Sequence, residues 1–118
     1  MKKLLKGILG LKDIEVKGNM KVDTFKKHFQ KSFGTEIRVY KTLTTGKGAK
    51  PADEKATLAS ICAKGKKVSD ITIKKTNTVG DVEDQFKEMM GIGIQIMLPD
   101  GKAFAPNDMR LKDVYKSK

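Results

Sequence analysis

The segment IEVKGNMKVDTFKKHFQKSFGTEIRVYK, residues 14–41, decides the fold, because ITIKKTNTVGDVEDQFKEMMGIGIQIML, residues 71–98, repeats its pattern without a gap. Nearly every apolar position is kept between the two segments, whereas the charged positions are not. Self-similarity at a fixed spacing is the signature of a repeated structural unit. We therefore predict two copies of one unit, at residues 12–63 and 69–116, within a single domain that spans residues 1–118.

Each copy predicts a strand, a helix and a second strand. Alternating apolar residues at 14–16 and 71–73 are typical of a strand with one buried face. The apolar spacing then changes to three or four residues, which draws one stripe along a helix of about three turns. The stripe consists of Val22, Phe25, Phe29 and Phe33 in the first copy and Val79, Val82, Phe86 and Met90 in the second. Alternation returns at 37–39 and 94–98 and predicts the second strand.

Shorter signals place the ends of these elements. Thr78 with Asp81 resembles a capping box, and Gly34 and Gly91 stand where a left-handed helix stop is expected. Other segments are predicted as local features: a turn at 99–101 that leads to a short strand at 102–104, a loop at 42–50, and helical turns at 57–61 and 110–114.

A strand–helix–strand connection of this length favours a right-handed crossover between parallel strands of one sheet. We therefore predict an α+β fold, a mixed sheet with two helices packed on it. The element order resembles the β-grasp superfold, of which ubiquitin is a familiar member, with strands at 4–9 and 12–17 before the helix and a closing strand at 71–73. One superfold hosts many activities, so the resemblance implies little about chemistry. The chain also ends in Tyr-Lys-Ser-Lys rather than in the Gly-Gly tail used for conjugation.

The amino-acid sequence of the first copy is a more specific signal than its order of elements. The phrases VKGNMKVDTFKKHFQKSFG at 16–34, IRVYK at 37–41 and ATLASI at 56–61 resemble a bacterial family of small domains. The resemblance implies a self-contained domain repeated in tandem, and it implies no activity.

The charge of the chain is strongly basic. Among 118 residues, 25 Lys and Arg stand against 14 Asp and Glu, which gives a formal net charge of +11. This balance attracts polyanions. However, there are only two arginines and no tryptophan, whereas base recognition favours guanidinium groups and single-strand binding favours aromatic platforms. Sequence-specific recognition of nucleic acid is therefore not expected.

We predict a non-enzymatic interaction module that docks a protein partner through an exposed sheet edge or face. On the strand at 37–39, Ile37 and Val39 should point inward, which leaves Arg38 and Tyr40 outward as a cation and an aromatic of the kind enriched at binding hot spots. The alternative is a non-specific nucleic-acid accessory protein that uses the lysines of the first copy. The candidate surface consists of Lys21, Lys26, Lys27, Lys31, Arg38, Tyr40 and Lys41.

Residues with reactive side chains are few. His28, the single histidine, lies on the solvent side of the helical stripe, and one imidazole does not complete the usual zinc sphere. Cys62, the single cysteine, suits a small buried hydrophobe in its helical turn. The loop TGKGAK at 45–50 lacks the spacing of a phosphate-binding loop. We predict no catalytic residue, no metal site and no cofactor.

The cellular compartment and the oligomeric state are predicted from the cysteine count, the length of the apolar runs and the charge. One cysteine excludes an intrachain disulfide, and no apolar run has the roughly 18 residues of a spanning helix. We predict a cytoplasmic protein without membrane contact. The net charge favours a monomer, whereas the basic first helix and the acidic second helix leave weak head-to-tail association as the alternative.

Overall fold

The computed structural model describes residues 11–41, 49–62 and 70–116. The elements in chain order are β1 (Ile14–Val16), α2 (Val22–Phe33), β2 (Ile37–Val39), α3 (Leu58–Ile61), β3 (Ile71–Ile73), α4 (Val79–Met89), β4 (Ile94–Ile96) and α5 (Leu111–Val114). Both long helices, both helical turns and all four of these strands fall where the sequence predicts them. The α+β class is therefore confirmed.

The strand pairing differs from the predicted mixed sheet. β1 pairs antiparallel with β3, and β2 pairs antiparallel with β4, as separate two-stranded ribbons. The prediction that the strands at 14–16 and 37–39 run parallel in one sheet is wrong, because α2 carries the chain from one ribbon to the other. Alternation along a strand reports that one face is buried, but it does not report which strand lies alongside.

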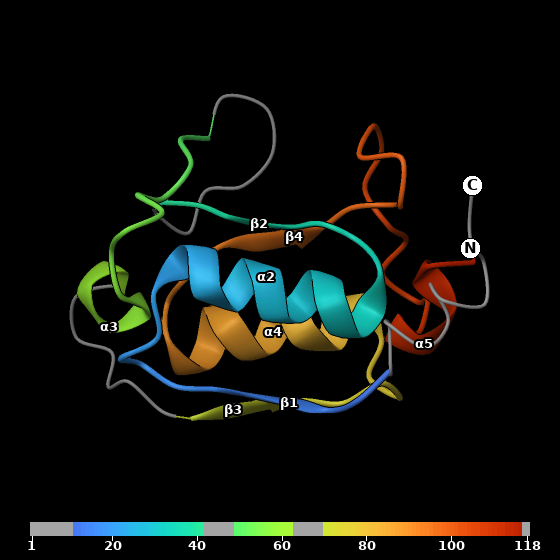
Figure 1. Ribbon diagram of the computed structural model, residues 1–118, viewed down its shortest axis with the longest axis horizontal. Coiled ribbons are helices and arrows are strands. Elements are labelled where there is room, and N and C mark those ends of the chain that lie inside the picture. Colours follow the sequence, from blue (N-terminus) through green and yellow to red (C-terminus); the bar gives the residue numbers. More distant parts are fainter. Residues whose placement is uncertain (1–10, 42–48, 63–69, 117–118) are drawn as a thin grey trace.

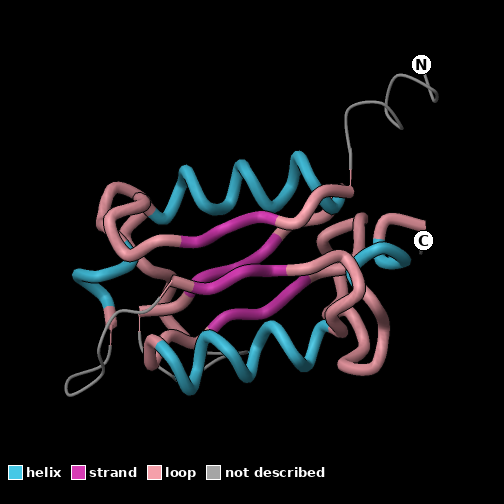
Figure 2. Tube along the Cα trace, turned by 90° about the horizontal axis from the view of Figure 1, so that it is seen from below, coloured by secondary structure: helices cyan, strands magenta, loops and turns pink. Residues whose placement is uncertain are grey.

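The two ribbons and the two long helices surround one core. In Figure 1 the β2–β4 ribbon lies above the helices and the β1–β3 ribbon lies below them. Figure 2 shows the strands between α2 and α4, which lie on opposite sides of the molecule. Each half of the chain therefore contributes one helix and one strand of each ribbon.

The strand register relates the two halves closely. Glu15 lies opposite Thr72 in the first ribbon, and Arg38 lies opposite Gln95 in the second. Both pairs join residues 57 positions apart, which is also the offset between the segments at 14–41 and 71–98. The centre of each ribbon is therefore formed by matching positions of the two segments.

Hydrogen bonds tie each long helix to a later part of its own half. In the first half, the Val22 N–H donates to the Ala56 carbonyl and the Leu58 N–H donates to the Met20 carbonyl. In the second half, the Val79 N–H donates to the Met109 carbonyl and the Leu111 N–H donates to the Asn77 carbonyl. Each of the four bonds is 2.9 Å long. The helical turns α3 and α5 are thus held at the starts of α2 and α4.

The helix ends follow the sequence signals. Thr78 and Asp81 form a reciprocal capping box at the start of α4, whereas Lys21, at the start of α2, makes no side-chain cap. Hydrogen bonds from the backbone and side chain of Thr78 lower the pKa of Asp81. Gly34 and Gly91 adopt φ values of 73° and 65° after the helices, a conformation that favours glycine.

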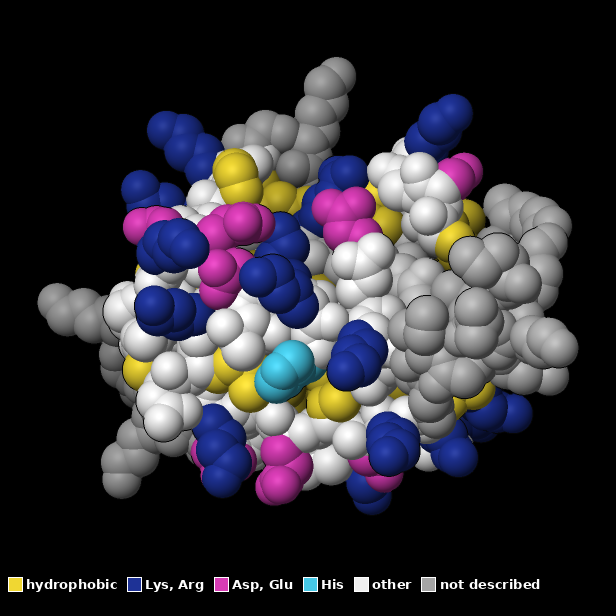
Figure 3. All heavy atoms as spheres, in the orientation of Figure 1, with side chains coloured by type: hydrophobic (Ala, Val, Ile, Leu, Met, Phe, Trp, Pro, Cys, Tyr) yellow, Lys and Arg dark blue, Asp and Glu magenta, His cyan; other side chains and the backbone are white. Residues whose placement is uncertain are grey.

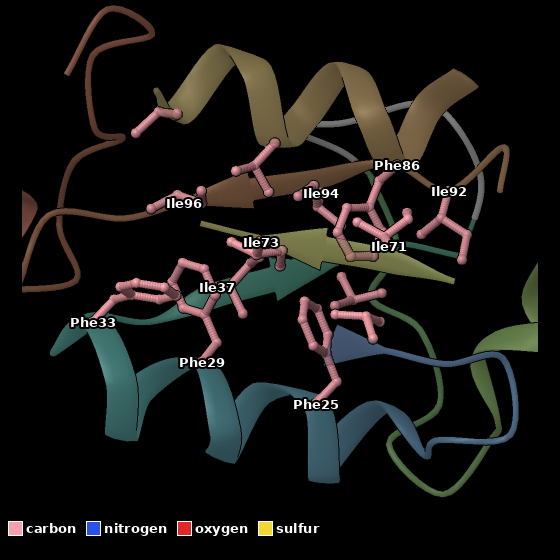
Figure 4. Close-up of a cluster of buried hydrophobic side chains, with 14 of the residues drawn as sticks. Phe25, Phe29, Phe33, Ile37, Ile71, Ile73, Phe86, Ile92, Ile94 and Ile96 are labelled. Atoms are coloured by element: carbon pink, nitrogen blue, oxygen red, sulfur yellow. The ribbon is translucent and has the colours of Figure 1, made fainter. Parts of the chain in front are cut away.

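The core consists of the two helical stripes and the inward faces of the strands. Phe25, Phe29, Phe33 and Phe86 are fully buried. Figure 4 shows the three phenylalanines of α2 pointing toward the isoleucines of the strands. The two stripes meet in the middle, where the rings of Phe25 and Phe86 lie 5.3 Å apart between centroids.

The segment after β4 is a turn followed by a single bridge. Gly101 has a φ of 71°, and Asp100 Oδ1 accepts a hydrogen bond from the Lys102 N–H, as the predicted turn requires. The predicted strand at 102–104 is reduced to one bridge between Met97 and Phe104. The predicted strand at 4–9 and most of the loop at 42–50 lie outside the described residues. Within the described ranges, no helix has the length and apolar character to cross a membrane.

Candidate docking groove

A groove of about 330 Å³ opens between α2, β2 and the returning segment at 49–51. Its lining residues are Lys26, Glu36, Arg38, Val39, Tyr40, Ala49 and Pro51. Three of them, Lys26, Arg38 and Tyr40, belong to the surface predicted from the sequence. The fold thus gathers a cation from the helix and a cation and an aromatic ring from the strand.

Lys26 is positioned by an ion pair across the chain. Its Nζ lies 2.8 Å from Glu54 Oε2, and 29% of the Lys26 side chain remains exposed. Lys26 lies beside Phe25 of the core stripe, at the edge of the buried face of α2. The Lys26 side chain is therefore held at the groove by this ion pair and remains partly exposed.

Arg38 is fixed on the outer face of β2 by two contacts. Its Nε donates to Glu36 Oε2 at 3.3 Å, and its Nη2 donates to the Gly101 carbonyl at 3.2 Å. A guanidinium carries further N–H donors on its other nitrogen. Within the described part of the chain, Nη1 has no hydrogen-bond partner, so Arg38 is oriented and still has donors to offer.

Tyr40 lies on the same face of the ribbon as Arg38, because its hydroxyl reaches Gln95, the residue opposite Arg38, but it is covered rather than free in solvent. The residue is only 6% exposed, and its hydroxyl lies 2.9 Å from Gln95 Oε1, to which it donates. The alternation of the strand holds, but Tyr40 is not exposed: the chain turns back after β2 and places Pro51 in a bridge beside Tyr40. Tyr40 therefore forms part of the groove wall, rather than projecting as a free anchor.

The remaining predicted lysines lie outside the groove. Lys21, Lys27, Lys31 and Lys41 are exposed and do not line it. Figure 3 shows Lys and Arg side chains spread over the face that includes α2, with Asp and Glu side chains among them. One such contact joins Lys55 Nζ to Asp23 Oδ2 at 3.5 Å. Desolvation raises the pKa of Asp23, but Lys55 and the Thr24 backbone outweigh it, so the pKa lies below its usual value.

The matching position on the second half carries the opposite charge. Glu83 on α4 stands 57 residues after Lys26, and burial raises the pKa of its carboxyl group, against a hydrogen bond from the Ile96 backbone. Asp84 adds to this increase in the pKa. The charge of the groove is therefore a property of the first half.

The reactive residues do not join the groove. His28 is exposed on α2, and Cys62 is half-buried at the end of α3. Burial raises the pKa of the Cys62 thiol, which is opposite to the shift of an activated nucleophile. Among the residues described, no three His, Cys, Asp or Glu side chains gather closely enough to hold a metal ion.

Comparison with protein-family models, with curated proteins and with solved structures finds no match for this chain.

Sequence reasoning missed half of the groove. Glu36, Val39, Ala49 and Pro51 line it, and Glu54 holds Lys26, but the sequence analysis places none of these residues in the candidate surface. The one usable signal is the sequence match between Lys50-Pro51-Ala52 and Ala105-Pro106-Asn107, which marks a returning segment in both halves. The match is displaced by two residues, because Pro51 bridges to Tyr40 and Phe104 bridges to the matching Met97. It does not show that this segment closes over β2.

Proposed function

We propose that this protein is a non-enzymatic interaction module that docks a protein partner through the groove lined by Lys26, Arg38 and Tyr40. The supporting observation is that two oriented cations stand beside an apolar wall formed by Val39, Pro51 and the Tyr40 ring. Arginine and aromatic residues in a partly desolvated hollow are the groups that dominate protein–protein binding energies. An acidic side chain flanked by apolar residues is the kind of ligand that such a hollow fits.

The nucleic-acid alternative has less support. Lys26 and Arg38 each have a carboxylate partner, at 2.8 Å and 3.3 Å. Nucleic-acid affinity comes mainly from several cations that contact successive phosphates, and among the described residues no other Lys or Arg lines the groove. The exposed lysines are also interspersed with acidic side chains (Figure 3).

A matched pair of variants tests the docking proposal. Lys26→Gln with Arg38→Gln removes both groove cations, and Lys27→Gln with Lys31→Gln removes the same charge from the exposed face of α2. Immobilised full-length protein and both variants are compared for quantitative capture of proteins from the cells that make it. We expect the groove variant to lose partners that the α2 variant retains.

Equal loss in both variants would mean that net charge, and not the groove, determines capture. Loss confined to the α2 variant, together with recovery of nucleic acid from the wild-type protein, would favour the alternative function.

We propose further that the chain is a tandem duplication of one unit, at residues 12–63 and 69–116. The equivalent hydrogen bonds at the starts of α2 and α4 support this proposal, as does the 57-residue offset in both ribbons. We expect the backbone of residues 14–41 to superpose on that of residues 71–98. The β-grasp resemblance and membership of the bacterial small-domain family remain proposals that rest on element order and sequence phrases. A cytoplasmic setting is a proposal that rests on the single cysteine.

A further inference from the structure

The outer edges of the β2–β4 ribbon differ between the two halves. Segment 50–52 runs along the outer side of β2, and segment 103–105 runs along the outer side of β4. Pro51 stands at the centre of the first edge and Phe104 at the centre of the second, because they bridge to Tyr40 and Met97 respectively.

The hydrogen bonds beside Phe104 show which way its backbone points. Leu98 N–H donates to the Ala103 carbonyl at 2.8 Å, and Ala105 N–H donates to the Ile96 carbonyl at 2.8 Å. Antiparallel strands alternate between residue pairs that exchange both bonds and pairs that exchange none. Met97 and Phe104 form a pair of the second kind, so the N–H and C=O of Phe104 point away from β4. Within the described ranges, neither group has a partner.

The first half closes the equivalent edge. Lys41 N–H donates to the Lys50 carbonyl at 2.8 Å, and Ala52 N–H donates to the Val39 carbonyl at 2.9 Å, so Pro51 occupies the same kind of outward position. Proline has no N–H, and it blocks the addition of a further strand. Phe104 instead offers a donor, an acceptor and a ring, with 48% of the residue exposed, the largest exposure of any large apolar residue in the described chain.

The charge beside Phe104 selects among possible partners. Lys102 is exposed in the turn, two residues before Phe104. A second copy of this chain would bring two molecules of net charge +11 together, which disfavours self-pairing. A partner segment with carboxylates complements the charge of Lys102 and of the chain instead.

We propose that the edge formed by Ala103, Phe104 and Ala105 accepts one extended segment of a partner protein as an added antiparallel strand. The segment places an apolar residue opposite Phe104, exchanges both backbone hydrogen bonds with it, and carries a carboxylate at the end nearer the turn that holds Lys102. This edge is separate from the groove at Lys26 and does not depend on its function. In Figure 1 the turn that leads to the edge projects beyond β4.

The test uses the full chain and a defined probe, acetyl-Thr-Glu-Thr-Val-Thr-Glu-Thr-amide, followed by amide NMR titration. We expect saturating shifts centred on Phe104, with slower hydrogen exchange of its amide. The same peptide with N-methylvaline keeps every side chain but loses one backbone donor, and we expect it to bind about tenfold more weakly. Replacing both glutamates of the peptide by lysine should also weaken binding.

Variants of the protein separate the edge from the groove. Phe104→Pro should abolish the shifts, and the fold should accept proline there because Pro51 occupies the equivalent bridge position. Phe104→Ala, which keeps the N–H, should retain weaker binding that still discriminates against the N-methyl peptide. Lys26→Gln, which removes a groove cation that does not contact the turn before the edge, should leave the affinity for the peptide unchanged.

Several results would overturn the proposal: no binding at millimolar peptide, equal binding of the N-methyl peptide, or shifts confined to the groove. Concentration-dependent self-association that Phe104→Pro abolishes would identify the occupant as a second copy and would equally overturn it. If Phe104→Pro does not fold, the N-methyl comparison on the wild-type protein decides alone.

Discussion

The ring of Phe25 on α2 packs against the ring of Phe86 on α4, with an interplanar angle of 32°. This contact joins the two halves of the chain through the middle of the core (Figure 4). Each half contributes only one strand to each ribbon, so neither half can bury its helical stripe without the other. The protein is therefore expected to unfold as one cooperative unit.

Truncation of the core phenylalanines should be costly in both halves. Phe29 and Phe86 occupy matching positions, and both are fully buried. We expect Phe29→Ala and Phe86→Ala each to lower the free energy of unfolding by about 3–5 kcal/mol, through lost burial and a residual cavity. Denaturant melts measure this change, and a nearly neutral result for either variant would show that its helical face is assigned wrongly.

The two long helices offer a matched test of capping. Thr78→Ala removes the cap of α4 and should lower the free energy of unfolding by about 1 kcal/mol. Lys21→Thr supplies a cap that α2 lacks and should raise the free energy of unfolding by about 0.5–1 kcal/mol. The same melts measure both changes. A Lys21→Thr protein that is less stable than wild type would mean that Lys21 makes a contact that stabilises the fold more than a cap does.

The capping box should also appear in the pH dependence of stability. Hydrogen bonds from Thr78 hold the pKa of Asp81 below its ordinary value of 3.8. A lowered pKa in the folded state gives stability that is present above the unfolded pKa and is lost as the pH falls through the folded pKa. We expect wild type to be more stable than Asp81→Ala near neutral pH, with the difference shrinking below pH 3.8. A difference that is constant between pH 7 and pH 2 would contradict the ionic cap.

The lysines of α2 should bring only weak binding to duplex DNA, independent of sequence. Such binding falls linearly on a plot of log affinity against log salt, with a slope set by the phosphates contacted. Lys27→Gln with Lys31→Gln should flatten this slope for any duplex. Fluorescence anisotropy across a salt series measures it, and strong binding that persists at physiological salt would instead support the nucleic-acid alternative.

The sequence predicted the elements well because each element is encoded by local residues. The stripe of Phe25, Phe29 and Phe33 requires only helical spacing, and Gly34 requires only a left-handed stop. The pairing of β1 with β3 was missed because it joins Val16 to Ile71, and no local pattern reports such a contact.

The candidate site was predicted only in part, for a related reason. Lys26 and Arg38 were identified because cations and their spacing can be read from the chain. The burial of Tyr40 could not be predicted from the sequence. It depends on the segment that brings Pro51 beside β2 and on a hydrogen bond to Gln95 of the other half. Contacts that close a groove between distant segments are properties of the folded chain.

Site-specific photo-cross-linking measures most directly whether the groove docks a protein partner. A photoreactive amino acid in place of Ala49 lies in the groove, and the same group in place of His28 lies on the exposed face of α2 and serves as the control. The account predicts a discrete cross-linked protein from the Ala49 position, lost when Lys26→Gln and Arg38→Gln are added, and none from the His28 position. Equal cross-linking from both positions, or none from Ala49 while capture by the intact protein persists, would contradict it.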